Sequence, residues 1–105
     1  MRYLYDTNIF LSYLIGEQRV RELFTERFLK KNQVVTSRIV RLELLSFPEL
    51  SVKEETIMRE MLDQFVMVPI TEEIENVAIY FRRKYRIKIP DAIIAATATT
   101  HLLPL

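Results

Sequence analysis

The segment RYLYDTN, residues 2–8, joins a short aromatic-rich run to three residues that favour turns and helix caps. The run from Arg2 to Tyr5 has the composition of a β-strand, and Asp6-Thr7-Asn8 are residue types that begin helices. Apolar residues 9–15 follow, and Gly16 interrupts them, which predicts a first helix in between. The chain therefore begins with a strand that enters a helix through an acidic turn.

Helical and strand patterns alternate along the rest of the chain. Apolar residues at helical spacing predict helices over residues 17–31, 38–47, 51–64, 72–85 and 91–101, with Ser37, Ser51 and Thr71 as N-caps. Short apolar runs predict strands over residues 33–36 and 65–70, and residues 103–105 fit the start of a fourth. This alternation favours an α/β fold with a short central parallel sheet, in which ligands bind beyond the carboxyl ends of the strands.

The composition restricts the chemistry that the chain can perform. Its 105 residues suffice for one domain with one core, and half of them are hydrophobic. There is no cysteine and only one histidine, which excludes disulfides, thiolate zinc sites and multi-histidine metal sites. A metal site would depend on carboxylates, which suit hard ions such as Mg²⁺ or Mn²⁺.

Charge and hydropathy bear on partners and location. The formal net charge is +1, so binding to nucleic acid would need a local basic patch. No apolar run approaches the ~20 residues of a membrane span, and the amino terminus reaches Asp6 too soon for a signal peptide. We expect a cytoplasmic protein without a membrane partner.

Asp6 is the only ionisable residue, tyrosines aside, between Tyr3 and Gly16. It follows the first predicted strand, at the edge of the sheet where ligands bind. The alternative is that Asp6 only caps the next helix, a role worth about 1 kcal/mol that Asn8 could also fill.

Asp91 is the only ionisable residue between Ile89 and Thr100, in a helix that is apolar or small on nearly every side. Such a helix is expected to be central and buried. The helix dipole contributes only about 0.3–1 kcal/mol to a first-turn carboxylate, whereas burying an unpaired charge costs several kcal/mol. Asp91 therefore needs an arginine or a metal ion, unless it lies at a partly exposed helix end.

Glu43 is placed by the helical angle of about 100° per residue. It falls on the same half of its helix as the apolar residues Ile39, Val40, Leu44 and Phe47, while Arg38 and Arg41 fall on the other half. A local salt bridge is disfavoured by this geometry. The alternative is a long side chain that reaches water past the edge of the core.

One arrangement accounts for all three acids, which is that they converge on a divalent metal ion. Crowded carboxylates repel one another, and such an ion relieves the repulsion. Mg²⁺ retains several waters and needs only a few carboxylates, and it can promote attack of water on a phosphodiester. Asp6, Glu43 and Asp91 are therefore the candidate catalytic and metal-binding residues.

Three blocks of sequence carry a resemblance to a known family. Residues 5–8 read YDTN, residues 42–44 read LEL and residues 90–98 read PDAIIAATA. In order and spacing along the whole chain, they resemble the motif blocks of PIN-domain ribonucleases, and more narrowly those of the VapC-like toxins of VapBC toxin–antitoxin pairs.

The resemblance implies a PIN-like three-layer α/β/α sandwich and a Mg²⁺- or Mn²⁺-dependent endoribonuclease that acts on RNA. Asp6, Glu43 and Asp91 would form its acidic metal site, and Thr7, Asn8 and Thr97 would support that site through hydrogen bonds. The family also implies a homodimer that a small VapB-like antitoxin inhibits. A further acidic or amide residue of the family follows a fourth strand, so we expect a single PIN-like domain over residues 1–105 that is truncated at its C-terminus.

Other functions stay open at this point. A non-catalytic PIN-like module that docks an antitoxin-type partner, or another copy of itself, is favoured by the lack of that last acidic motif. A phosphoryl-accepting regulator ranks low, because Asp6 has no acidic neighbour and no lysine follows Lys88. The basic residues between Arg82 and Lys88 fit phosphate contacts, but a solvated helix face is the more common outcome for such a run.

Overall fold

The computed structural model describes residues 1–101 of the chain. In this part of the chain, three parallel strands form one sheet in the order β1-β2-β3, with bounds β1 (Arg2–Tyr5), β2 (Gln33–Ser37) and β3 (Val66–Val68). Tyr5 pairs with Thr36, and Val35 pairs with Val66. The predicted parallel sheet is confirmed.

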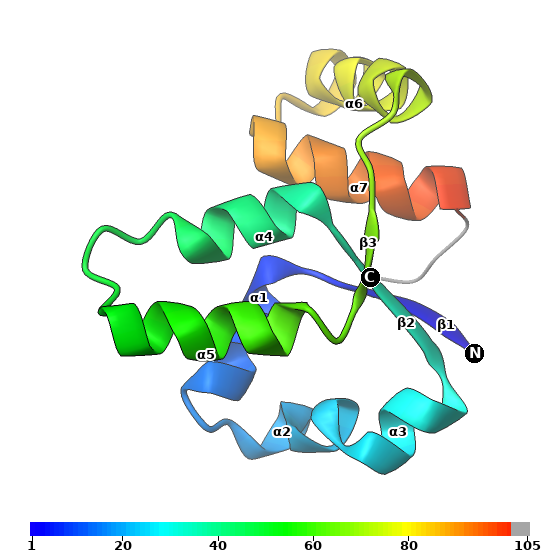
Figure 1. The fold of residues 1–105 in the computed structure, drawn as a ribbon. Helices are drawn as coiled ribbons and strands as arrows, with labels where there is room; N and C mark the ends of the chain where they lie inside the picture. Colours follow the sequence, from blue (N-terminus) through cyan, green and yellow to red (C-terminus); the bar gives the residue numbers. More distant parts are fainter. Residues whose placement is uncertain (102–105) are drawn as a thin grey trace.

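Helices cover both faces of the sheet (Figure 1). The helices in chain order are α1 (Thr7–Leu14), α2 (Gln18–Arg21), the 3-10 helix η1 (Glu22–Phe24), α3 (Glu26–Lys31), α4 (Arg38–Leu45), α5 (Val52–Leu62), α6 (Glu72–Tyr85) and α7 (Ile89–His101). The strands are added to the sheet in one direction, from β1 to β2 to β3. Because crossovers between parallel strands are right-handed, the helices that connect β1 to β2 and those that connect β2 to β3 lie on the same face of the sheet. Figure 1 shows α6 and α7 on the opposite side, which confirms the predicted α/β class and its layers.

The buried core fixes α1 against the sheet. Phe10 is fully buried, and its ring centroid lies 6.1 Å from that of Tyr5 in β1 and 5.2 Å from that of Phe65, which directly precedes β3. Burying a side chain of this size stabilises the fold by about 1.5–3 kcal/mol. Because Phe10 stands four residues after Asp6, this packing also fixes the acidic turn between β1 and α1.

The predicted helix caps are confirmed. The side-chain oxygens of Ser37, Ser51 and Thr71 each accept a hydrogen bond from a backbone N–H in the first turn of the helix that follows. Ser51 and Glu54 form a reciprocal capping box, as their spacing predicts.

The single helix predicted over residues 17–31 is wrong, because α2, η1 and α3 divide this segment. Thr25 is extended (φ −71°, ψ 149°), and its hydroxyl accepts a hydrogen bond of 3.2 Å from the N–H of Phe28. A threonine satisfies its hydroxyl better as a cap than inside a helix. The local hydrogen bond therefore overrides the helical spacing of the apolar residues.

Other boundaries also differ from the prediction, and β3 covers Val66–Val68 rather than residues 65–70. Helix α4 ends at Leu45 rather than at residue 47, and the hydroxyl of Ser46 bonds back to the carbonyl of Leu42. Helix α7 begins at Ile89 rather than at Asp91, with Pro90 in its first turn, where the missing N–H costs nothing. The fourth strand predicted from residue 103 lies outside the described residues. Within residues 1–101, no helix has both the length and the apolar character to span a membrane.

Candidate functional site

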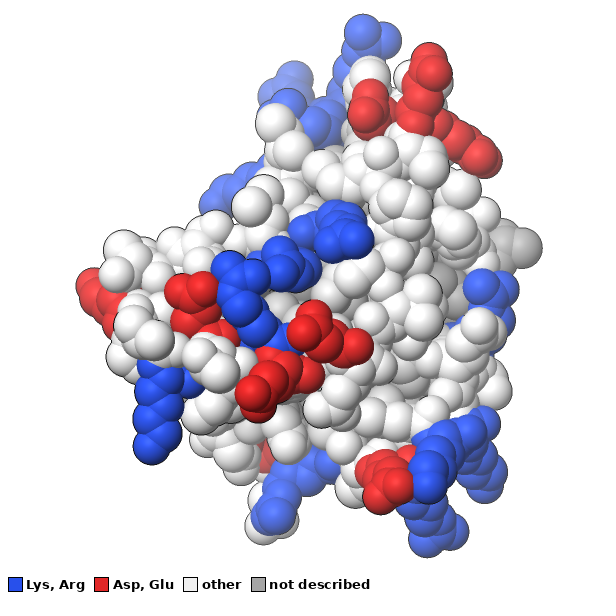
Figure 2. All heavy atoms as spheres, in the orientation of Figure 1, with Lys and Arg blue, Asp and Glu red and all other residues white. Residues whose placement is uncertain are grey.

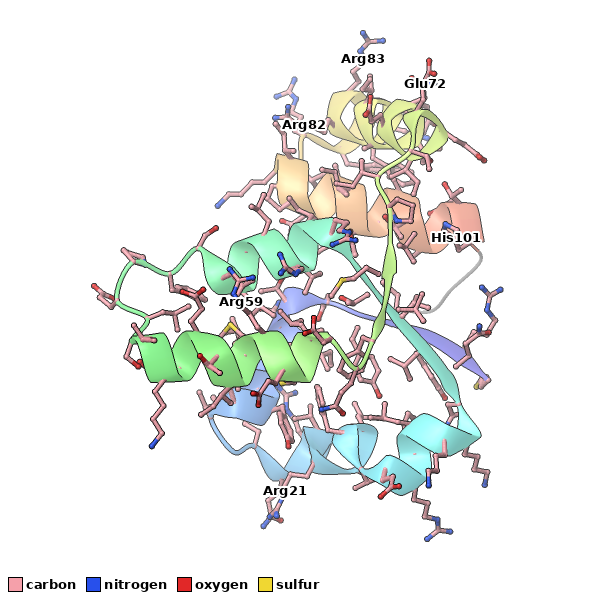
Figure 3. The ribbon with its side chains drawn as sticks, viewed as in Figure 1. Arg21, Arg59, Glu72, Arg82, Arg83 and His101 are labelled. Carbon is pink, nitrogen blue, oxygen red and sulfur yellow. The ribbon has the colours of Figure 1, made fainter. Side chains whose placement is uncertain are left out.

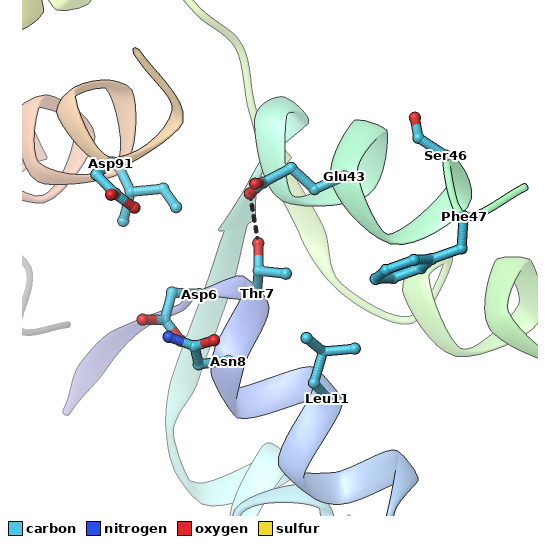
Figure 4. Close-up of a pocket in the computed structure, with 9 residues that line it drawn as sticks. Asp6, Thr7, Asn8, Leu11, Glu43, Ser46, Phe47 and Asp91 are labelled. Carbon is cyan, nitrogen blue, oxygen red and sulfur yellow. Dashed lines mark hydrogen bonds between the residues drawn. The ribbon is translucent and has the colours of Figure 1, made fainter. Parts of the chain in front are cut away.

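Three acidic residues from three separate elements line one pocket beside the carboxyl end of β1 (Figure 4). Asp6 directly follows β1, Glu43 lies on α4 and Asp91 lies in the first turn of α7. The pocket has a volume of about 500 Å³. Its other lining residues are Thr7, Asn8, Leu11, Ser46, Phe47 and Ile94.

Asp6 caps α1 and lines the pocket at the same time. Its backbone is extended (φ −93°, ψ 177°), and its Oδ1 accepts a hydrogen bond of 3.0 Å from the N–H of Ile9. The predicted capping by Asp6 is therefore confirmed, and Asp6 lines the pocket as well. Within residues 1–101 no hydrogen bond engages the second carboxylate oxygen, so capping leaves Oδ2 available for a ligand.

Glu43 is joined to the acidic turn by a hydrogen bond. Thr7 Oγ1 donates to Glu43 Oε1 at 2.7 Å, which links the start of α1 to α4 (Figure 4). Glu43 is partly buried, and its neighbours Val40 and Leu44 are fully buried. This placement agrees with the helical angle, which put Glu43 beside the apolar stripe.

Asp91 is exposed, so the argument that its buried charge requires a cation is wrong. Ala92 and Ile94, the apolar residues that follow it, are buried, as the pattern of this helix predicts. The first turn of α7 nevertheless reaches solvent, which is the helix-end alternative left open by the sequence. Asp91 still faces Asp6 and Glu43 across the pocket (Figure 4).

Of the three residues predicted to support the acids, two line the pocket and one does not. Asn8 lines the pocket beside Thr7. Thr97 is buried away from the pocket lining, and its hydroxyl donates a hydrogen bond of 2.7 Å to the carbonyl of Ile93. Thr97 is therefore not among the residues that this site brings together.

The three carboxylates line one pocket but do not form a compact ligand set. Within residues 1–101, no group of three or more Asp, Glu or His side chains lies close enough together to hold one metal ion. The donors are nevertheless the hard oxygens that Mg²⁺ and Mn²⁺ prefer. Mg²⁺ commonly binds one or two carboxylates directly and fills its other positions with water or phosphate. The donor chemistry therefore fits such an ion, with some positions left to water or a substrate.

An apolar wall beside the acids was not predicted. Leu11 of α1 and Phe47, which follows α4, line the pocket on the side away from Asp91 (Figure 4). The helical spacing placed Phe47 in the buried stripe, but its side chain is 46% exposed, because α4 ends at Leu45. The spacing of the apolar residues does not show that α4 ends before Phe47, so it could not predict that Phe47 is exposed.

Comparisons with known proteins assign the family. The sequence profile of the PIN domain matches residues 3–105. A chain in the toxin–antitoxin complex from Klebsiella pneumoniae is similar to this one, with 30% identity and a TM-score of 0.80 over 98% of this chain and 82% of that one. A comparison with curated protein sequences finds no significant match.

Two further solved structures share the fold. A chain of FitAcB from Neisseria gonorrhoeae has 27% identity and a TM-score of 0.70, over 98% of this chain and 84% of that one. A chain of VapBC2 from Rickettsia felis, solved with a DNA fragment from its promoter, has 21% identity and a TM-score of 0.76, over the same shares. The chain therefore belongs to the PIN-domain family and resembles the VapC-type proteins of toxin–antitoxin pairs.

Proposed function

We propose that this chain is a toxin-type endoribonuclease that hydrolyses RNA with the help of Mg²⁺ or Mn²⁺. The observation that carries the proposal is the pocket that Asp6, Glu43 and Asp91 line together. These residues lie far apart in sequence, and they stand in the three blocks that resemble PIN-domain ribonucleases. Membership of the PIN-domain family supports the same function.

Asp6, Glu43 and Asp91 would hold the metal ion, directly or through water. Two of these carboxylates are already oriented by the fold, Asp6 by the N–H of Ile9 and Glu43 by the hydroxyl of Thr7. Side chains that are held before the ligand arrives lose less freedom when it binds. When bound, a divalent ion supplies Lewis-acid stabilisation of the charge that develops on the phosphate.

An antitoxin-type protein is the partner that we propose. One solved structure similar to this chain is a toxin–antitoxin complex, and another is VapBC2 bound to a DNA fragment from its promoter. Phe47 lines the acidic pocket and is 46% exposed, so an apolar side chain remains beside the acids for a partner to cover. Homodimerisation stays a prediction from the family resemblance, and a cytoplasmic location stays a prediction from the hydropathy and the amino terminus of the sequence.

A second candidate function is a non-catalytic module that docks such a partner. It is favoured by the finding that the described acids form no compact group of three. In that case the carboxylates would contact basic side chains of the partner instead of a metal ion. The two functions differ in whether the chain alone binds Mn²⁺ through Asp6, Glu43 and Asp91.

Metal binding and RNA cleavage test the proposal together. Calorimetry should detect Mn²⁺ binding to the chain, and labelled single-stranded RNA should be cleaved only when the metal is present. Asp6→Asn, Glu43→Gln and Asp91→Asn should each abolish cleavage. Glu49→Gln is the matched control, because it also removes one negative charge but lies on the exposed loop after α4, outside the pocket lining.

These outcomes test the site assignment and separate the two functions. Cleavage that survives Asp91→Asn would show that the site is assigned wrongly. A folded chain that neither binds Mn²⁺ nor cleaves RNA would support the docking module.

A further inference from the structure

A surface rich in basic and aromatic residues lies at the end of α6, and the acidic pocket does not include it. Residues 80–88, here called the basic surface, contain five basic residues, two tyrosines and no acid. All five basic side chains are exposed, and Tyr80 and Tyr85 are 53% and 57% exposed. Large aromatic side chains of this kind usually contribute to a core or an interface.

The positive charge of the basic surface is not neutralised within the described part of the chain. The ion pairs in residues 1–101 join Arg19 to Glu17, Lys30 to Glu26 and Arg59 to Glu55. None of them involves residues 80–88. The acids of α6, which include Glu72, lie in the first turn of the helix, at the opposite end from its basic last turn. Figure 2 shows both the acidic and the basic side chains of this region exposed at the top of the molecule.

Lys84 lies beside both exposed tyrosines. Its Nζ donates a hydrogen bond of 3.1 Å to Tyr80 Oη, and it lies 5.6 Å from the centroid of the Tyr80 ring and 5.5 Å from that of Tyr85. These distances are within the range of cation–π attraction. The hydrogen bond to Tyr80, and secondly the nearby Tyr85 phenol, raise the pKa of Lys84 above its ordinary value.

Stabilisation of the helix dipole explains only part of this surface. Basic residues in the last turn of a helix interact favourably with the dipole by about 0.3–1 kcal/mol each, and Arg82, Arg83 and Lys84 meet that condition. Arg86 and Lys88 lie beyond the helix, and the dipole gives no reason for exposed tyrosines. The combination of rings and uncompensated cations is instead that of a single-strand nucleic-acid surface.

The basic surface adjoins the acidic pocket through the start of α7. Helix α6 ends at Tyr85 and α7 begins at Ile89, and the N–H of Ala92 donates to the carbonyl of Lys88 at 2.9 Å. Lys88 is thus within one helical turn of Asp91. Figure 3 shows Arg82 close to the first turn of α7.

We propose that residues 80–88 bind single-stranded RNA and lead it to the pocket of Asp6, Glu43 and Asp91. This inference rests on the proposed ribonuclease function for its substrate. The cations would contact phosphates, and the tyrosine rings would stack on unpaired bases. A duplex buries the faces of its bases, so an aromatic surface favours a single strand.

Binding without metal tests the inference apart from catalysis. Fluorescence anisotropy would follow a labelled oligouridine of about 12 nucleotides in EDTA, with Arg83→Ala/Lys84→Ala/Lys88→Ala against the wild-type chain. The triple variant should weaken binding at least tenfold and flatten the salt dependence by about 0.7 per lost phosphate contact. Tyr80→Leu should weaken binding by about tenfold, and Tyr80→Phe should retain most of it, because the ring remains.

The control removes the same charge from another helix. Arg27→Ala/Lys30→Ala/Lys31→Ala takes three basic side chains from α3, all of which are exposed. This triple should change binding less than threefold. Equal losses for the two triples would overturn the inference in favour of diffuse attraction, as would an unchanged affinity in the first triple. Tighter, surface-dependent binding of duplex DNA would overturn the choice of single-stranded RNA.

Single-turnover cleavage separates this inference from the proposed function. The first triple should raise the enzyme concentration for half-maximal rate and leave the saturated rate unchanged. Surface-dependent RNA binding without any metal-dependent cleavage would remove the proposed function and keep the inference. Cleavage that is independent of residues 80–88 would remove the inference alone.

Discussion

Thr7 Oγ1 donates a hydrogen bond of 2.7 Å to Glu43 Oε1, and so joins two acidic sequence blocks that are 36 residues apart. Thr7 is the first residue of α1, directly after Asp6, and Glu43 lies on α4. The bond therefore connects the turn between β1 and α1 to α4. It holds the Glu43 carboxylate toward the pocket without neutralising it. Thr7 is therefore a positioning residue for Glu43.

Removing this hydroxyl should weaken metal binding more than folding. Thr7→Val preserves the shape of the side chain and removes the donor, so we expect Mn²⁺ affinity to fall by about ten- to a hundredfold. Calorimetry measures the affinity, and thermal unfolding checks the fold. Thr7→Ser restores the donor and should recover most of the affinity. A loss that serine fails to restore would show that the methyl group, and not the hydrogen bond, matters.

Asp6 should show separable contributions to stability and activity. Asn and Asp cap helices almost equally well, so Asp6→Asn should unfold at nearly the wild-type urea concentration while RNA cleavage is lost. Asp6→Ala removes the cap that Ile9 uses and should lower the free energy of unfolding by about 1 kcal/mol. If Asp6→Asn destabilises the chain as much as Asp6→Ala, the fold depends on the charge as well as on the cap.

The capping box of α5 should make part of the stability depend on pH. The backbone N–H of Ser51 donates a hydrogen bond of 3.0 Å to Glu54 Oε1, and this bond, with a smaller contribution from the Ser51 side chain, lowers the pKa of Glu54 below its ordinary value. A folded-state pKa below the unfolded value means that the contribution is full above pH 4.5 and is lost as the pH falls through the folded pKa.

Unfolding of Glu54→Gln at several pH values measures this contribution. Its deficit relative to the wild type should be constant near neutrality and should shrink as the solution becomes more acidic. Glu60→Gln lies on the same helix outside the cap, so it should reproduce the wild-type pH profile. A deficit for Glu54→Gln that persists unchanged to low pH would assign the effect to packing.

Much of this fold follows from local sequence, and the exceptions have local causes. The strands, the caps at Ser37, Ser51 and Thr71 and the angle of Glu43 depend on short-range spacing, which a sequence displays. The break at Thr25 depends on a hydroxyl that caps a helix in preference to lying inside one. Periodicity of apolar residues does not register that competition.

The three acids that line the candidate site were predictable from the sequence, but their environment was not. Asp6 and Asp91 stood out because each is an isolated charge in an apolar segment. Asp91 is exposed because the first turn of α7 lies at the surface of the fold. The pattern of apolar residues within one helix does not show which end of that helix reaches the surface. Thr97 shares the helix with Asp91, yet its hydroxyl turns to the carbonyl of Ile93, because a buried threonine in a helix satisfies itself locally.

Arg86 should show a conflict between stability and RNA binding. It is the only residue other than glycine with a positive φ in residues 1–101 (φ 56°, ψ 36°), at the C-terminal end of α6. Glycine adopts this conformation without strain, whereas other residues pay about 1 kcal/mol or more. Arg86→Gly should therefore raise the free energy of unfolding by up to about 1 kcal/mol, while the loss of one cation weakens oligouridine binding severalfold.

Arg83→Gly is the matched control for that conflict, because it removes the same side chain from inside α6. Glycine within a helix costs about 1 kcal/mol, so this variant should lose stability and RNA affinity together. Urea unfolding and anisotropy on the two variants would give opposite changes in stability with similar changes in affinity. Should Arg86→Gly gain stability and keep full affinity, the strained arginine would have no part in the RNA surface, and the left-handed turn would need another explanation.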